Sequence, residues 1–285
     1  MSQKASRQVR LAIASNAGGS GKTTMTTHLA YAIGAKGYKV VIVELDQNGS
    51  LVVFGRLTPP EVAEQSVATI LRKSFKGNYP LVPLWSERLS TVFAIQGGQG
   101  LEETIQELYG YNRRPYTLMD RLEDFPLDAD LIIFDTPASL EPMGVLALAA
   151  STHVLVPLKP EYKDTGSFGG FLEWYYSKID ELRLKPKPEI LGFVPTRIDL
   201  SVSVHRNILG LDEKGRKKTD INWSETLPGL IEGMGIHCFP PIKHYAIHLT
   251  ASGAGQPVHL YRPGCEASKN FDPIVNQLTK LLKGK

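Results

Sequence analysis

The sequence predicts an α/β fold in which helices flank a doubly wound, mostly parallel sheet. Three observations lead to this prediction. Apolar runs typical of buried strands alternate with helical patterns along the 285 residues. The first run, residues 9–14, leads into a glycine-rich turn and then into a helical pattern. Polar residues that suit a binding site directly follow several runs, and the carboxyl ends of parallel strands share one edge of a sheet.

The glycine-rich turn has the form of a phosphate-binding loop. It reads GGSGKTT and precedes a helix that we expect over residues 22–36. Glycines let backbone N–H groups approach a polyphosphate closely, and the positive end of the helix adds to the attraction. Lys22 supplies a charge for the β- and γ-phosphates, and Thr23 offers a hydroxyl to Mg²⁺. The residues expected to bind a nucleotide here are Gly18, Gly19, Ser20, Gly21, Lys22, Thr23 and Thr24.

Two later strands are expected to end in an aspartate. An aliphatic run over residues 40–45 leads to Asp46, and the apolar residues 131–134 lead to Asp135. The second run has the form of a Walker B strand, whose acid reaches the Mg²⁺ shell in P-loop proteins. Many buried strands end in Asp, but downstream of a phosphate-binding loop this pattern predicts a magnesium site built from Thr23 and Asp135.

The rest of the chain continues the alternation. Between Asp46 and Asp135 we expect helices at residues 61–72, 101–108 and 116–125. A loop is expected at residues 76–83 and a strand at residues 89–95. Beyond Asp135 we expect helices at residues 143–150 and 168–182, and strands at residues 153–158 and 190–194. Lys159 and the pair Thr196 and Arg197 follow these strands, so they belong to the same edge as the phosphate-binding loop.

Length and composition favour one domain over residues 1–285, with residues 1–8 as a solvated arm. A net charge of +3 does not mark the whole chain as a nucleic-acid binder, so any such role requires a local patch. The 2 cysteines form neither a metal pattern nor a disulfide framework, and no run of about 18 apolar residues occurs. We therefore expect a cytoplasmic protein that does not insert stably into a membrane.

Five segments, in this order, resemble the ParA/MinD family of deviant Walker ATPases. They are GGSGKTT, ELDQNGS, LIIFDTPAS, VPLKPEY and GFVPTRID. The resemblance implies ATP and Mg²⁺ as ligands, and a sandwich homodimer that forms on ATP binding and separates after hydrolysis. It also implies that Asp46 orients the attacking water and that Thr196 and Arg197 lie along the adenine. Pro240 and Pro241 either close the other side of the base or form a simple turn.

The sequence departs from the family at residue 17. Family members carry a signature lysine there, which reaches the partner's phosphates across the dimer, whereas this chain has Ala17. Either hydrolysis is crippled or another cation replaces the lysine, because a second-site cation restores charge stabilisation in the transition state. Lys159 is our first candidate and Lys163 the second. A missing signature lysine resembles the McdA-type subgroup, which distributes carboxysomes over the nucleoid with the adaptor McdB.

The resemblance implies a positioning ATPase that associates with the nucleoid. We expect the ATP-bound dimer to bind DNA non-specifically, and a McdB-like or ParB-like adaptor on a cargo to stimulate hydrolysis. Carboxysome positioning is our first interpretation, and plasmid or chromosome partition is the second. Two basic groups are candidates for DNA contact, although each also fits a solvated face: Lys214, Arg216, Lys217 and Lys218, and Lys269, Lys280, Lys283 and Lys285.

Two other classes stay open at this point. A MinD-like, membrane-associated ATPase would use the apolar stripe of residues 274–282, but the stripe also fits a final helix packed on the sheet, which we favour. A scaffold that binds ATP without turnover is conceivable because Ala17 carries no charge. His28, inside the first helix, is expected to be packed or on the surface rather than catalytic, because nothing stands at metal-ligand spacing from it.

Overall fold

The computed structural model describes residues 8–284, except for the side chains of residues 162–167. In this part of the chain seven strands form one sheet, in the order β3-β4-β2-β5-β1-β6-β7. The strands are β1 (Val9–Ile13), β2 (Val40–Glu44), β3 (Val82–Pro83), β4 (Val92–Ile95), β5 (Leu131–Asp135), β6 (His153–Leu158) and β7 (Glu189–Pro195). All neighbouring strands are parallel except β3 and β4. The predicted doubly wound, mostly parallel sheet is confirmed.

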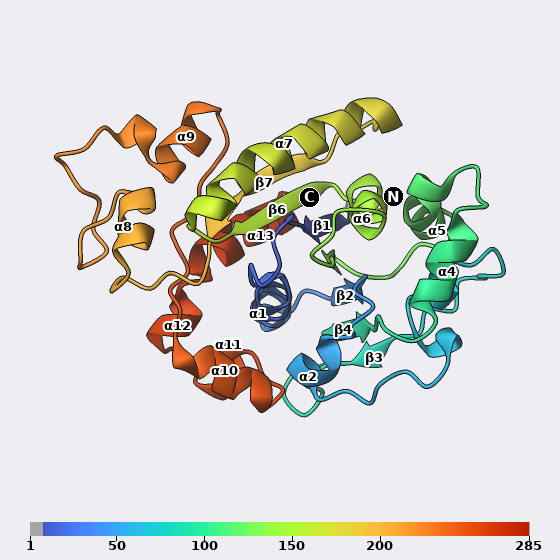
Figure 1. Ribbon diagram of the computed structural model, residues 1–285. Helices are drawn as coiled ribbons and strands as arrows, with labels where there is room; N and C mark the ends of the chain where they lie inside the picture. The colour runs from blue at the N-terminus through green and yellow to red at the C-terminus, as the bar shows by residue number, and fades with distance from the viewer. Residues whose placement is uncertain (1–7, 285) are drawn as a thin grey trace.

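Helices cover both faces of the sheet (Figure 1). On one face, α1 (Lys22–Gly34) and α13 (Asp272–Lys283) bury apolar side chains such as Leu29 and Leu278 against the strands. On the other face, α5 (Thr117–Asp124), α6 (Met143–Ala150) and α7 (Tyr162–Leu182) form a second core. The strands between them are mostly apolar because both of their faces are buried.

The remaining helices are short. They are α2 (Leu51–Gly55), α3 (Ala68–Leu71), α4 (Leu101–Leu108), α8 (Ser203–Leu209), α9 (Leu227–Gly233), α10 (Ala246–Gly253), α11 (Val258–Tyr261) and α12 (Glu266–Lys269). Figure 1 shows α10 and α11 beside α1, on the side away from α6 and α7. Residues from the end of the chain therefore lie next to the helix that follows the glycine-rich loop.

The strand order determines which loops meet. Strand β1 pairs with β5 on one side and with β6 on the other, and β2 pairs with the far side of β5. Asp135 at the end of β5 therefore lies level with Ile13 of β1 and Glu44 of β2. The loop after β1 is surrounded by the loops after β2, β5 and β6, as the sequence predicted.

Two expectations between β2 and β4 were wrong. The helix expected at residues 61–72 is divided into a 3₁₀ turn, Ala63–Gln65, and the four-residue α3. It breaks because the backbone N–H of Val67 donates to Gln96 O (2.8 Å) and the Ser66 hydroxyl donates to Gln99 O (2.7 Å), outside the helix. The loop expected at residues 76–83 ends in β3, where a proline is tolerated because the strand is at the sheet edge.

The structure at the two ends of the chain tests the expected solvated arm and the expected final helix. Gln8, expected in a solvated arm, is fixed to the body because its side-chain amide donates to the carbonyls of Leu127 (2.8 Å) and Ala129 (2.9 Å). Residues 1–7 lie outside the described residues. At the other end, α13 packs its apolar stripe on the sheet, which confirms the arrangement favoured for residues 274–282. No helix in residues 8–284 has the length and apolar character needed to span a bilayer.

Candidate active site

The glycine-rich loop leads from β1 into the N-terminus of α1. Gly19 and Gly21 have φ angles of +66° and +88°, which side chains rarely adopt, so these positions require glycine. The ammonium of Lys22 lies back over the loop and donates to Ala17 O at 3.1 Å and to the Ser15 hydroxyl at 3.4 Å. The loop therefore presents a helix N-terminus and a positive charge in one place, which suits a polyphosphate.

Asp135 is fully buried at the end of β5. Its Oδ1 atom accepts a hydrogen bond from the Thr26 hydroxyl at 3.1 Å, whereas its Oδ2 atom has no hydrogen-bond partner among the described residues. Burial raises the pKa of Asp135 to about 6, and hydrogen bonds from Thr23 and Thr26 and the charge of Lys22 oppose this shift. A buried carboxylate oxygen without a donor, next to a threonine hydroxyl, fits the oxygen ligands that Mg²⁺ prefers.

Asp46 follows β2 and faces the same region. Its Oδ1 atom accepts hydrogen bonds from the backbone N–H (2.9 Å) and the side-chain amide (2.7 Å) of Asn48. Burial lowers the pKa of the Lys22 ammonium, and the charges of Asp135 and Asp46 partly offset this effect. Asp46 therefore lies close enough to act on both Lys22 and Asp135.

Glu44, which sequence reasoning missed, supports the Asp46 loop. It is fully buried, and its two carboxyl oxygens accept hydrogen bonds from the backbone N–H groups of Leu51 and Gly97, each at 2.8 Å. Burial raises the pKa of Glu44 to about 8 although these two bonds lower it. A side chain on Gly97 would collide with the Asp46 carbonyl, so the segment after β4 packs directly under Asp46. The available signal was an acidic residue inside an otherwise aliphatic strand.

Residues after β6 and β7 contact the loop from the other side. The Thr196 hydroxyl donates to Ser20 O at 2.7 Å, and Arg197 Nη1 donates to Gly19 O at 3.2 Å. A Cβ atom built on Gly19 would lie 3.4 Å from Lys159 Nζ and 3.5 Å from Arg197 Nη1. Two cationic side chains thus lie over the loop at Gly19, two residues after Ala17. The side chain of Lys163, the second candidate, lies outside the described residues.

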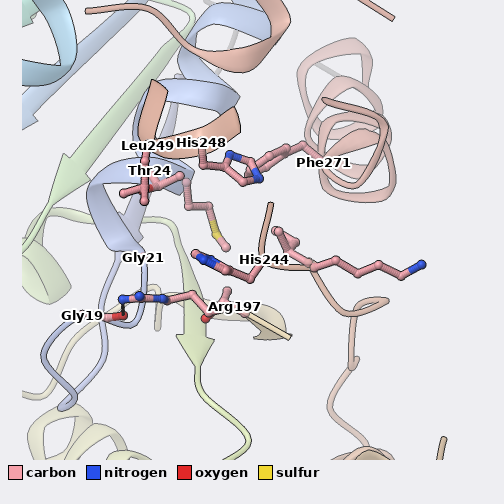
Figure 2. Close-up of a pocket in the computed structure, with 12 residues that line it drawn as sticks. Gly19, Gly21, Thr24, Arg197, His244, His248, Leu249 and Phe271 are labelled. Carbon is pink, nitrogen blue, oxygen red and sulfur yellow. Dashed lines mark hydrogen bonds between the residues drawn. The ribbon is translucent and has the colours of Figure 1, made fainter. Parts of the chain in front are cut away.

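A cavity of about 220 Å³ opens beside the loop (Figure 2). Gly19, Gly21 and Thr24 form its loop side, and Arg197 lies at the same end. Figure 2 shows His244, His248, Leu249 and Phe271 around the rest of it. These side chains come from α10, from the residues just before it and, for Phe271, from the start of α13, and motif reasoning did not identify them.

The prolines expected near a base do not line this cavity. Pro240 and Pro241 precede the lining residues Ile242, Lys243 and His244 in the chain. Pro240 is exposed. The contact of these two prolines with a base stays a prediction.

His28 is packed beneath the cavity, one of the two places expected for it. Its Nε2 atom accepts a hydrogen bond from the Val258 N–H at 3.0 Å, so the proton is on Nδ1, which donates to Thr24 O at 2.6 Å. The ring stacks on Phe271 with the centroids 4.4 Å apart. His28 therefore connects α1 with the start of α11 and has no ring nitrogen free for catalysis.

Sequence comparison links the chain to partition proteins. The AAA_31 family, described as an AAA domain, matches residues 9–190, more than half of the chain. The chromosome-partitioning ATPase Soj of Thermus thermophilus is 29% identical over 196 residues, which cover 67% of this chain and 70% of Soj. The chromosome partitioning protein ParA of Caulobacter vibrioides is 29% identical over 203 residues, which cover 70% of this chain and 73% of ParA.

Structural comparison gives a similar fold over nearly the whole chain. Apo McdA of Cyanothece has a TM-score of 0.76 at 21% identity, with 95% of this chain and all of McdA (100%) covered. An ATP complex of a variant of the same protein has a TM-score of 0.75 at 20% identity, with 96% and 97% covered. At this level of identity the likeness shows the fold. The cavity residues from Thr196 onward lie beyond the segment that the family match covers.

Proposed function

Because this chain belongs to the AAA_31 family and is a P-loop protein of the ParA type, we propose that it binds Mg²⁺ and ATP at the loop after β1 and hydrolyses ATP to ADP and phosphate. One observation carries the proposal. Lys22, Asp46, Asp135, Thr196 and Lys159, which come from four different strand ends and one helix, surround a single glycine-rich loop. The ATP complex of the similarly folded McdA supports the choice of nucleotide.

Each group at the site has a role in phosphoryl transfer. The backbone N–H groups of residues 18–24 hold the phosphates, and Lys22 neutralises charge on the β- and γ-phosphates. Thr23 and Asp135 would hold the Mg²⁺, which would neutralise negative charge on the β- and γ-phosphates when bound. Phosphoryl transfer requires the reactants to be positioned and the charge of the transition state to be stabilised, more than it requires covalent chemistry. Side chains of the protein can position the reactants and stabilise this charge.

Asp46 and Lys159 complete the proposed reaction. The carboxylate of Asp46 accepts a hydrogen bond from the attacking water and holds it in line with the γ-phosphate. Lys159 takes the role of the signature lysine, whose position in this chain is occupied by Ala17. The position of its ammonium over Gly19 supports this role. We assign Thr196 and Arg197 to the adenine, and their hydrogen bonds to Ser20 O and Gly19 O place them beside the loop that would hold the phosphates of the same nucleotide.

Phosphate release measured in purified protein tests this proposal. We expect the wild type to release phosphate from Mg·ATP, and Asp46→Ala to bind ATP with wild-type affinity but to turn it over far more slowly. We expect Lys22→Ala to bind ATP at least about 30-fold more weakly, because truncating one partner of a buried charge pair costs about 2–5 kcal/mol. Lys36→Ala, in the exposed turn that follows α1, is the control. Wild-type turnover by Asp46→Ala would refute the assigned role of that residue.

We further propose that ATP binding drives formation of a homodimer that binds nucleoid DNA non-specifically. An adaptor on a cargo then stimulates hydrolysis and releases the dimer, so that the cargo follows the resulting gradient. The fold similarity to McdA and the position of Lys159 support carboxysome positioning with a McdB-like adaptor. The 29% identity to Soj and ParA supports plasmid or chromosome partition with a ParB-like adaptor as the alternative.

Salt dependence tests the DNA-binding proposal. Lys214 and Lys217 are exposed on the loop after α8, and Lys280 and Lys283 are exposed on α13. We expect DNA affinity in Mg·ATP to fall steeply with salt, with a slope of about 0.9 in log K per phosphate contact, because counterions are released. The charge-removing variant Lys214→Ala/Lys217→Ala should reduce that slope. A salt-independent affinity, or equal binding in ATP and ADP, would argue against it.

A further inference from the structure

Two histidines near the cavity, His248 and His259, have ring nitrogens without hydrogen-bond partners among the described residues. Both ring nitrogens of each histidine are buried. Buried polar side-chain atoms are bonded in the large majority of native proteins, so these four nitrogens need an explanation. His28 lies between the two rings, at centroid distances of 5.4 Å and 5.7 Å, but its own nitrogens are already bonded to Thr24 and Val258.

The two histidines differ in their place relative to the cavity. His248, on α10, lines the cavity together with its neighbour Leu249 (Figure 2). His259, on α11, is not among the lining residues and packs against Phe271 and Tyr31. A ligand in the cavity therefore reaches His248 and not His259.

The cavity suits a flat heteroaromatic ring attached to a phosphate chain. One end is the glycine-rich loop, where the phosphates are held. Met25, Ile242, Leu249 and Phe271 supply apolar surface to its wall. Leu249 is 69% exposed although it is a large apolar residue, so a ring placed against it would remove apolar surface from water.

The His248 ring has the chemistry to meet the edge of such a ligand. Burial lowers the pKa of His248 to about 4, so the ring is neutral at pH 7 and carries one donor and one acceptor. A half-turn about the Cβ–Cγ bond exchanges ring nitrogens with ring carbons and leaves the outline of the side chain unchanged. The half-turn therefore brings a nitrogen to a different side of the ring without repacking the neighbours.

We propose that His248 is a specificity-determining residue that hydrogen-bonds the edge of a purine base held in this cavity. The inference rests on the proposed function, because it requires the phosphates of the same nucleotide to lie in the loop after β1. It assigns base recognition to α10, a helix that lies beyond the residues matched by the family.

Calorimetric titration with ATP and with inorganic tripolyphosphate, both with Mg²⁺, separates the base from the phosphates. We expect His248→Phe to weaken ATP binding about tenfold, the loss of one hydrogen bond, and to leave tripolyphosphate binding unchanged. The matched control is His259→Phe, which removes an equally buried and unpartnered imidazole and should bind both ligands like the wild type. His248→Gln keeps a donor and an acceptor and should recover part of the ATP affinity.

Each outcome decides the matter. Wild-type ATP affinity in His248→Phe overturns the inference, and so does an equal loss in His248→Phe and His259→Phe, because that result indicates general repacking. If His248→Phe does not fold, His248→Gln and His259→Phe carry the test, since a Gln variant with unaltered ATP affinity and reduced tripolyphosphate affinity also contradicts it. A wild type that binds neither ligand refutes the proposed function itself.

Discussion

Ala17 and Lys159 are the pair of residues on which the proposed chemistry of this chain depends. The alanine brings no charge to the glycine-rich loop, yet the ammonium of Lys159 and the guanidinium of Arg197 both lie over Gly19. Arg197 has a φ angle of +57°, an uncommon conformation for a residue with a side chain, and this conformation accompanies its hydrogen bond to Gly19 O. Lys159 and Arg197 therefore bring positive charge to the glycine-rich loop, to which Ala17 contributes none.

Glu44 makes the stability of the protein depend on pH. A carboxyl whose pKa is raised from 4.5 to about 8 on folding binds protons more tightly in the folded state, so stability falls as pH rises between these values. The pKa values of Asp135 and His248 lie at about 6 and about 4 in the folded protein, so their contributions change mainly below pH 6.5. Between pH 6.5 and 8 Glu44 therefore dominates among these groups.

Urea unfolding at several pH values tests this effect. We expect the wild type to lose on the order of 1–2 kcal/mol of unfolding free energy between about pH 6.5 and 8, because one proton is released from the folded state. In Glu44→Gln this slope should disappear, although the variant is less stable at every pH because one backbone N–H loses its acceptor. Glu87→Gln, at an exposed position, should keep the wild-type slope. A Glu44→Gln protein with an unaltered slope would exclude Glu44 as the source.

Sequence reasoning located the residues that follow a motif and missed those that depend on packing between distant segments. Asp46 and Asp135 were predicted because each follows an apolar run, and Lys22 was predicted because it stands in the GGSGKTT motif. The hydrogen bond from Gly97 to Glu44, and the place of His248 in the cavity, require contacts between segments tens of residues apart. No local pattern carries that information.

At the scale of elements, strands and helices with a continuous apolar run or a clear helical period were predictable, and the helices of residues 246–269 were not. The predicted bounds of β6 and α6 agree with the structure because a continuous apolar run marks where each element begins and ends. Helices α10, α11 and α12 have between four and eight residues and are separated by glycine and proline, so they show too few turns for a helical period to appear. Their helical form depends on packing against α1 and on one another.

Helix α13 provides the test at this scale. Leu278 is fully buried against the sheet, whereas Lys280 on the same helix is exposed. We expect Leu278→Ala to lower the free energy of unfolding by about 2–5 kcal/mol and Lys280→Ala to change it by less than about 0.5 kcal/mol, both measured by chemical denaturation. Equal and small effects would mean that α13 is not docked in solution, and the membrane-associated alternative would then regain support.

For the whole molecule, the order of the strands is what assembles the site. Placing β1 between β5 and β6 surrounds the glycine-rich loop with the ends of three neighbouring strands, and β7 adds Thr196 and Arg197. The doubly wound fold was predictable because alternating strands and helices allow few other topologies. The central claim that follows is that ATP, held at this edge, brings two copies of the chain together with Lys159 at the shared phosphates.

Light scattering of the Asp46→Ala variant tests that claim most directly, because slow hydrolysis keeps the nucleotide intact during the measurement. We predict twice the mass of one chain in Mg·ATP and the mass of one chain in Mg·ADP. Adding Lys159→Ala should reduce the fraction of dimer in Mg·ATP, whereas adding Lys36→Ala should not. The same mass in ATP and ADP would contradict the account, and a dimer unaffected by Lys159→Ala would remove Lys159 from it.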